Sequence, residues 1–480
     1  MVFSSFLFII IFFPLSLGTY YIAGTNSLKQ LVLILFSLIF YIYGDHVYVS
    51  VMIISIMIAW VFGTLIDRNR KYANALTFIG ISLILGLLCW FKYMGFISNV
   101  FKIYNYVSPE VAHYINNVYL PLGISFYSFQ SISYLIDINR REIAHEPSIV
   151  KFAMYKTFFP QLIAGPIVRY KDVKQYINTP QLSIDNFAYG LERFVYGLAA
   201  KVLIANNCGS IADTVFDMPE PILTAWHVWL GSIGYFFQIY FDFAGYSSMA
   251  IGMALMFGIK FKENFNFPYS AASITDFWRR WHISLSSWFR DYLYIPLGGN
   301  RHGLVRTLLN SYIVFLLCGL WHGASWNFIL WGLYHGTFLV IEKLINTFNL
   351  VKLPPFLYFI RIIYVWIVII ISWVLFRSED LTSSVDYLTI MFSPSKMIYD
   401  ESIYEILNLK TVLLFLIATI FSSLKLIPNM FNDLLSVEHN KNFLTVFQSI
   451  GRLIILVMVF FISLTTLAGT VSNPFLYYRF

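Results

Sequence analysis

The sequence predicts an all-α polytopic membrane protein, and three observations support that prediction. Of its 480 residues, 58% are hydrophobic and only 12% are charged, which is about half the charged fraction of an ordinary soluble domain. Many apolar runs reach roughly 18 residues or more, enough for a helix to cross about 30 Å of hydrocarbon. The short alternating segments of a transmembrane barrel are missing. We therefore expect one membrane-embedded domain over residues 1–480.

The basic residues lie in short clusters between the apolar runs. This distribution is typical of cytoplasmic loops under the positive-inside rule. It explains the formal charge of +7 better than nucleic-acid binding does. When the clusters at residues 67–71 and 139–142 are taken as cytoplasmic, the N-terminus is expected on the outer side.

The apolar runs predict about twelve membrane spans. The first five cover roughly residues 3–22, 31–44, 47–66, 74–93 and 118–137. Two further spans are expected over roughly residues 184–205 and 222–241, and two more lie within 306–344. The last three cover roughly residues 357–376, 411–428 and 447–469. An even count brings the C-terminus back to the outer side.

Other stretches do not fit simple spans. Residues 151–174 are basic at both ends, and Pro160 and Pro166 break their apolar centre. A re-entrant or half-buried segment is predicted there, because a broken helix needs other helices to cover its freed backbone. Residues 265–306 are the least hydrophobic interior stretch, and their arginines and tryptophans predict cytoplasmic helices at the membrane interface. Asp242 interrupts the apolar pattern just after the span that ends near residue 241.

The strongest candidate for chemistry is His322, near the middle of the apolar stretch 306–344. An ionisable side chain inside a membrane segment is costly and is a functional-site hypothesis by default. Trp321, Ser325 and Asn327 surround it in the sequence. A neutral imidazole in an apolar tunnel can accept a proton from a hydroxyl and return it to a leaving group. The alternative is a structural histidine that is hydrogen-bonded to a carbonyl between helices.

A second histidine, His282, lies in the basic stretch WRRWHISLSSWFRDY. Arg279 and Arg280 could face an anionic acyl donor from the cytosol, or they could only extend to lipid head groups beside an interfacial helix. The sequence contains no GxSxG elbow, phosphate-binding loop, HxxxD pattern or metal-ligand spacing. Whether His282 and His322 share one site cannot be read from their separation in sequence.

Six motifs resemble those of a known family. They are MVFSS at the start, PLGISFYSFQSISYLID, FFPQLIAGPIVRY, FDFAGYSSMAIG, FWRRWHISLSSWFRDYLYIPLGGNR and LWHGASWNFILWGLYHG. Together they resemble the membrane-bound O-acyltransferases, in the bacterial branch of alginate and peptidoglycan O-acetyltransferases and the D-alanyl transferase of teichoic acids. One departure is Ser248, where the family motif has an aspartate.

This resemblance implies a ring of helices around a tunnel between cytosol and exterior. It makes His322 the catalytic histidine and His282 the second active-site histidine. It implies acetyl-CoA as acyl donor with no resident cofactor or metal, an exported cell-envelope polysaccharide as final acceptor, and an extracytoplasmic acetyltransferase partner. The residues expected to bind donor or substrate are Arg279, Arg280, Trp321, Asn327 and Asp242.

The chain ends in NPFLYYRF, so that Phe475, Tyr477 and Phe480 form an F-x-Y-x-x-F pattern. The pattern resembles the tail of the small partner peptide of teichoic-acid D-alanylation. That resemblance implies that Tyr477 accepts the acyl group after His322 activates its hydroxyl. An aromatic belt at the membrane surface is the alternative explanation.

A transporter or flippase for an anionic lipid or glycan is the competing class of function. Arg279 and Arg280 would then bind the cargo, and His322 would relay protons. No internal repeat is evident in the sequence, which weighs against a secondary transporter.

Overall fold

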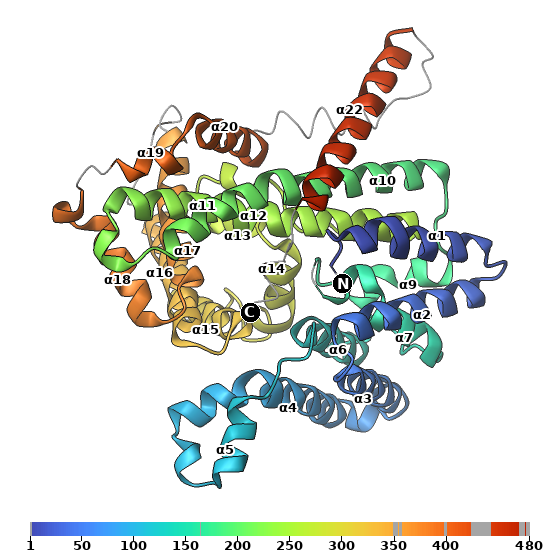
Figure 1. Cartoon of the computed structure of the whole chain (residues 1–480). Coiled ribbons are helices and arrows are strands. Elements are labelled where there is room, and N and C mark those ends of the chain that lie inside the picture. Colours follow the sequence, from blue (N-terminus) through green and yellow to red (C-terminus); the bar gives the residue numbers. More distant parts are fainter. Residues whose placement is uncertain are drawn as a thin grey trace. The chain divides into compact units, whose positions relative to one another are not determined.

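The computed structural model describes residues 2–163, 165–348, 354, 358–397, 401–423, 443–469 and 476. All regular secondary structure within these residues is helical (Figure 1). In the same residues, eight helices are long and apolar enough to cross a membrane, and two shorter apolar helices cover Phe8–Ile22 and Leu409–Ser423. The prediction of an all-α, multi-pass membrane protein is confirmed.

The described residues form two compact units. Unit 1 holds the residues up to Phe194 together with Met249–Lys262, and unit 2 holds Val195–Ser248 and the residues from Glu263 to Leu476. Among the residues that the structure describes, the chain therefore leaves unit 1, returns to it once and leaves again. Each unit is described by itself.

Unit 1 begins with short and long helices that follow one another closely. They are η1 (Phe8–Phe12), α1 (Phe13–Ile22), α2 (Asn26–Gly44), α3 (Val49–Arg68), α4 (Ala73–Val100), α5 (Pro109–Asn116), α6 (Ile124–Asn139), α7 (Ile149–Thr157), α8 (Phe159–Leu162) and α9 (Tyr170–Asn178). Helix α10 (Ile184–Ala199) begins in this unit. The predicted interrupted stretch 151–174 is divided among α7, α8 and α9, and Pro160 lies in the first turn of α8.

Helix α6 is the centre of unit 1 and packs against both α3 and α4 (Figure 1). Nearly all of its side chains are buried, including its serines. Ser131 and Ser133 satisfy their hydroxyls by donating to backbone carbonyls one turn earlier. Gly63 of α3 leaves room for the ring of Tyr134, because an added Cβ would lie 2.8 Å from that ring. Small residues on the neighbours thus let a mixed polar and aromatic helix be buried.

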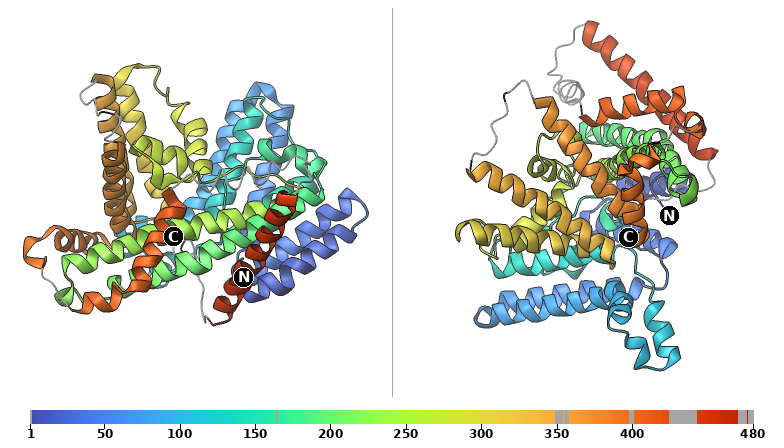
Figure 2. Two further views of the ribbon diagram at one scale, coloured as in Figure 1. Left: turned by 90° about the horizontal axis from the view of Figure 1, so that it is seen from above. Right: turned by 90° about the vertical axis from the view of Figure 1, so that its left-hand side faces the viewer.

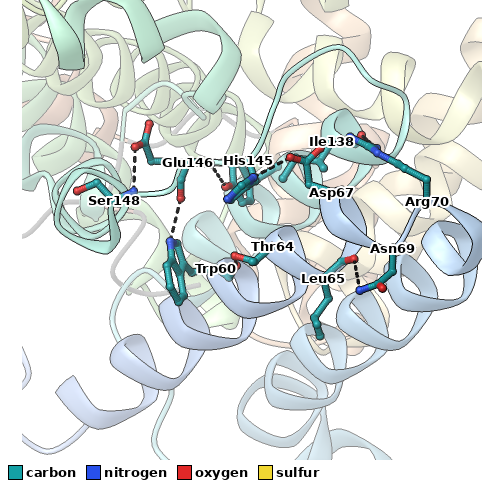
Figure 3. A network of polar contacts seen from close by, with 11 residues as sticks. Trp60, Thr64, Leu65, Asp67, Asn69, Arg70, Ile138, His145, Glu146 and Ser148 are labelled. Carbon is teal, nitrogen blue, oxygen red and sulfur yellow. Dashed lines mark hydrogen bonds and ion pairs between the residues drawn. The ribbon is translucent and has the colours of Figure 1, made fainter.

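A polar network closes one end of unit 1 (Figure 3). Asp67, at the end of α3, accepts from Arg70 and lies 2.7 Å from Nδ1 of His145. Arg70 also donates to the carbonyl of Ile138 at 2.9 Å. The two basic clusters at residues 67–71 and 139–142 therefore meet at the same end, in agreement with their predicted location on one side of the membrane.

Unit 2 contains the longest helix and the segments with the candidate residues. Its elements are η4 (Ala200–Ala205), α11 (Asn206–Phe216), α12 (Ala225–Met256), α13 (Ile274–Arg280), α14 (Ile283–Phe289), η7 (Arg290–Tyr294), α15 (Gly303–His322), α16 (Trp326–Phe348), α17 (Tyr358–Arg377), α18 (Leu381–Phe392), α19 (Ser402–Ile406), α20 (Leu409–Ser423) and α22 (Phe443–Ala468). The last eight residues of α12 belong to unit 1. The stretch 265–306 forms short helices, as its composition predicted.

Helix α12 continues through Asp242, where the apolar pattern is interrupted and the predicted span 222–241 ends. The carboxylate of Asp242 is compensated there by Lys201, with Nζ 2.5 Å from Oδ1. Gly245 lets the helix approach its neighbour, because an added Cβ would lie 2.6 Å from the carbonyl of Gly197. A charge that breaks the sequence pattern therefore does not break the helix, since its partner comes from another element.

Candidate active site

His322 is the last residue of α15, at the turn of a hairpin formed with α16. The two helices lie side by side in Figure 1 and in the right-hand view of Figure 2. The imidazole is 4% exposed, and its centroid lies 5.0 Å from that of Trp331 and 5.3 Å from that of Phe376. The histidine predicted near the middle of 306–344 is therefore buried at the hairpin turn, in an aromatic pocket.

Two glycines allow α15 and α16 to make this close hairpin. A Cβ on Gly319 would lie 2.1 Å from the carbonyl oxygen of Phe328, and one on Gly332 would lie 2.2 Å from that of Phe315. These distances are far shorter than any real Cβ contact, so neither position accepts a side chain without separation of the helices. Small residues at such crossings are the usual means of close packing between membrane helices. The contact brings Trp331 of α16 against His322.

His282 lies between α13 and α14 and has a left-handed backbone conformation, with φ of 44° and ψ of 54°. The residue is fully buried. Its ring is edge-on to Phe243 of α12, with centroids 4.7 Å apart. Non-glycine residues rarely adopt this conformation and tend to do so at functional sites.

Trp321 connects the two histidines. Its ring centroid lies 4.8 Å from that of His322 and 6.2 Å from that of His282. Two imidazoles separated by forty positions in the sequence therefore contact the same indole. The structure places both in one aromatic environment, which the sequence left undecided.

Burial also affects the charge of His282. Its side chain forms no ion pair with the residues that the structure describes, and burial lowers its pKa to about 3. The imidazole is therefore neutral at physiological pH and keeps one nitrogen free to accept a proton. Nδ1 lies 3.2 Å from Oδ1 of Asn264, a buried residue that the sequence analysis did not single out.

Arg279 and Arg280 have different environments. Arg280 forms an ion pair with Asp276 one turn earlier in α13, at 2.9 Å. Arg279 is exposed and forms no ion pair or hydrogen bond with any residue that the structure describes. Its charge is available to a ligand, whereas that of Arg280 is already compensated.

Arg279 lies at a cavity of about 470 Å³ between the α13–α14 segment and the α15–α16 hairpin. Most of the lining is apolar or aromatic, with Trp278, Phe289, Phe315, Cys318 and Leu339 among its residues. Phe315 and Cys318 share a face of α15 with His322, at helical spacings of seven and four residues. The cavity therefore follows this face of α15 as far as Cys318, one turn before His322, and neither His282 nor His322 lines it.

The other predicted binding residues use their polar groups within the chain. Asn327, in the first turn of α16, donates to the carbonyl of Ser378 at 2.9 Å. Asp242 pairs with Lys201 and also accepts a hydrogen bond from the backbone N–H of Leu476 at 2.8 Å. Tyr477, the next residue, lies outside the described residues.

His335 belongs to the same aromatic cluster. It is fully buried on α16, one turn after Trp331, with ring centroids 4.9 Å apart. Its Nδ1 accepts from Nε1 of Trp278 at 3.3 Å. This contact fixes α13 against α16, which gives His335 a structural role.

Glu342 is a residue that the sequence analysis did not identify. It is buried on α16, and its carboxylate accepts from the backbone N–H groups of Ile274 and Thr275 at 2.6 and 2.9 Å. These are the free N–H groups at the start of α13, where a negative charge is stabilised. A glutamate in an apolar run indicates a buried charge with partners elsewhere in the chain, but these partners could not be identified from the sequence.

The fold and the site define a multi-pass membrane enzyme with two buried histidines in one aromatic environment. Residues 92–378 match the model of the membrane-bound O-acyltransferase family, MBOAT. The chain belongs to this family, and it is an acyltransferase. Membership in a family of enzymes decides against the transporter as the primary function.

Several relatives are similar over half of the chain or more. A probable alginate O-acetylase of Azotobacter vinelandii is 40% identical over 82% of this chain and 78% of its own length. A peptidoglycan O-acetyltransferase of Helicobacter pylori is 35% identical over 81% of this chain and 79% of its own. A teichoic acid D-alanyltransferase of Bacillus subtilis is 30% identical over 52% of this chain and 65% of its own.

The glycine contact between α15 and α16 can be tested by Gly319→Ala. The added methyl would collide with the carbonyl of Phe328 and separate the helices, so we expect a loss of about 1–3 kcal/mol in stability and reduced acyltransferase activity. Thermal unfolding of the purified protein is the measurement. Gly86→Ala in α4 is the matched control, since an added Cβ there meets nothing within 4 Å. Equal thermal stability of the two variants would contradict the role given to Gly319.

Proposed function

We propose that the protein moves an acetyl group from cytosolic acetyl-CoA across the membrane for O-acetylation of an exported cell-envelope polysaccharide. The observation on which this rests is the contact of two buried imidazoles, His282 and His322, with one indole. The polysaccharide is peptidoglycan or an alginate-like polymer, by analogy with the named activities of the Helicobacter and Azotobacter relatives.

The proposed step is transfer of an acetyl group from a thioester to a hydroxyl. His322 takes the proton of the acceptor hydroxyl while the oxygen attacks the thioester carbonyl. The carbon–sulfur bond then breaks, and the sulfur leaves with the bonding electrons and receives the proton. Free CoA and an acetyl ester result, and His322 returns to its neutral form. An aromatic surrounding suits this cycle, because it excludes water that would hydrolyse the thioester.

The cavity beside Arg279 supports an anionic donor. Its apolar lining suits the uncharged arm of CoA, and the uncompensated guanidinium suits a phosphate. Because the cavity follows the face of α15 toward His322, a donor held by its phosphates at Arg279 would extend its thioester toward the histidine. Arg280 is expected to contribute less, since Asp276 already neutralises it.

The C-terminal segment is the proposed first acceptor. The hydrogen bond from Leu476 to the buried carboxylate of Asp242 supports a fixed attachment of this segment. Tyr477 is the next residue in the sequence. Asp242 would then act by holding the tail rather than by binding donor or polysaccharide.

The acetyl group on Tyr477 must still reach a sugar. We propose that an extracytoplasmic acetyltransferase partner completes this step. The tail hydroxyl would carry the acetyl group to the outer side, where partner and polysaccharide meet.

Radiolabelled acetyl-CoA and the purified protein test the function. We expect release of CoA and label on the protein, and a loss of both by about 10²- to 10⁴-fold in His322→Ala, as for removal of a general base. His46→Ala, an exposed histidine remote in sequence, is the control and should keep full activity. The proposal would be refuted if the wild-type protein transferred no acyl group even with the partner and polysaccharide supplied. That result would favour the alternative function, a transporter or flippase.

A pair of variants at neighbouring arginines tests the donor site. Arg279→Ala should raise KM for acetyl-CoA about tenfold with little change in kcat, because it removes one charge-assisted contact with the bound donor. Arg280→Ala is the matched control on the same helix and should change KM much less. Equal effects of the two substitutions on KM would show that the uncompensated charge of Arg279 is irrelevant to donor binding.

The tail attachment is tested at two adjacent positions. Leu476→Pro removes the N–H that donates a hydrogen bond to Asp242, so we expect reduced label on the protein. Leu476→Met keeps both the N–H and an apolar side chain, and this control should remain labelled.

Tyr477→Phe should abolish the label on the protein and the acetylation of the polysaccharide. Normal acetylation in cells that make the Tyr477→Phe protein at wild-type levels would exclude the acyl-tyrosine.

A further inference from the structure

We propose that Asn264 is a positioning residue that holds His282 in a single tautomer, with its hydrogen on Nδ1 and the lone pair of Nε2 available to the site. The inference rests on the proposed function, because it assigns a state to one of the two histidines in that site. It extends the function by naming a residue outside every motif that the sequence analysis considered catalytic or binding.

Asn264 is bound tightly to the segment around His282. It is 1% exposed, and its backbone carbonyl accepts from the N–H of Ile283 at 2.9 Å. Its side-chain Oδ1 accepts from Ser284 twice, from the backbone N–H at 3.2 Å and from Oγ at 2.8 Å. One asparagine therefore holds the start of α14 through both its main chain and its side chain.

These contacts determine which end of the Asn264 amide faces His282. A backbone N–H can only donate, so the atom opposite Ser284 N must be the oxygen. The amide nitrogen is then on the other side, where it donates to Oγ of Ser247 on α12 at 3.1 Å. A flipped amide would place two donors against each other at Ser284.

The tautomer of His282 follows from the orientation of the amide. Its Nδ1 lies 3.2 Å from Oδ1 of Asn264, an oxygen with no hydrogen to give. A lone pair on Nδ1 would face another lone pair there. Oγ of Ser284 also lies 3.4 Å from Nδ1, but its hydrogen is donated to Oδ1 of Asn264 at 2.8 Å, so Nδ1 carries the hydrogen. Nε2 of a neutral ring is then unprotonated, and it has no hydrogen-bond partner among the residues that the structure describes.

The backbone around His282 supports the same arrangement. The N–H of Ile283 is bound by Asn264, and the carbonyl of His282 accepts from Ser286 at 3.0 Å. These two bonds hold the left-handed conformation of His282, which directs its ring toward Phe243 and Trp321. Asn264 therefore determines both the tautomer of His282 and the direction of its ring.

An unprotonated Nε2 can accept a hydrogen bond from a donor group of a bound substrate other than the acceptor hydroxyl, whose single hydrogen goes to His322. The described contacts of His282 come from Asn264, from Ser284 of α14, from Phe243 of α12 and from Trp321 of α15. None of these side chains carries a charge. A charge introduced at position 264 would therefore act on His282 without competition from these contacts.

Asn264→Asp is the decisive variant, because a carboxylate keeps the acceptor at Nδ1 and Ser284 but adds a negative charge. Ser247 can rotate its hydroxyl to donate to the new oxygen. The charge stabilises the imidazolium and raises the pKa of His282, so the neutral ring persists only at higher pH. We expect the acid limb of kcat/KM for CoA release to move up by about one pH unit or more, with activity recovered at alkaline pH.

Asn264→Ala removes the acceptor and adds no charge. It should lower kcat at all pH values and leave the acid limb in place, which separates the loss of positioning from the effect of charge. A purely structural asparagine would give a uniform loss of activity in both variants and no shift of the limb. That result, or a wild-type profile in Asn264→Asp, would overturn the inference.

Two further measurements separate this inference from the proposed function. If His282→Ala retains full activity, His282 has no role in the reaction, and both its role and that of Asn264 fail. If His282→Ala is inactive while Asn264→Asp keeps the wild-type pH profile, the inference about Asn264 alone fails. Should Asn264→Asp not fold, ¹⁵N-histidine solid-state NMR of the wild type reports the tautomer directly. The signal of His282 is the one that disappears in His282→Gln. If that signal shows the hydrogen on Nε2, the inference about Asn264 is overturned.

Discussion

The close approach of α15 and α16 at Gly319 and Gly332 is the constraint on which the site depends. It places Trp331 of one helix beside His322 at the end of the other, and Trp331 in turn contacts His335. Trp278 binds His335 and so attaches α13 to the same hairpin. The position of Arg279 relative to the cavity follows from that attachment. Wider separation of the two helices would therefore disturb His322, the aromatic rings around it and the cavity beside Arg279 together.

Buried charge in unit 2 is compensated by groups from distant parts of the chain. Asp242 is balanced by Lys201 and by the backbone of Leu476. Glu342 is balanced by free N–H groups at the start of α13. A buried carboxylate that lost its partners would be strongly destabilised. These charges therefore specify which segments pack together, and the segments so connected are the ones that hold the candidate site.

Much of the fold could be predicted from the sequence, because apolar length and basic clusters are local signals. His322 was singled out for the same reason, since a titratable group in an apolar run is visible in one dimension, whereas His282 lies in a basic stretch. The common contact of His282 and His322 with Trp321 was not predictable, because it depends on how α15 meets the α13–α14 segment.

The continuation of helix α12 through Asp242 was missed, because the compensating Lys201 lies far away in the sequence.

Arg279 and Arg280 are adjacent in the sequence, and the sequence alone did not distinguish their environments. The two are equivalent in composition and in their expected location, and only helix geometry separates them. Arg280 is four residues from Asp276 and lies on the same face, whereas Arg279 is rotated by about 100° and faces the cavity.

Asn264 is a parallel case, since a single asparagine in a polar stretch resembles any loop residue. Its significance comes from three hydrogen bonds to residues about twenty positions later. The proposed tautomer of His282 is therefore set by a residue that only the three-dimensional arrangement identifies.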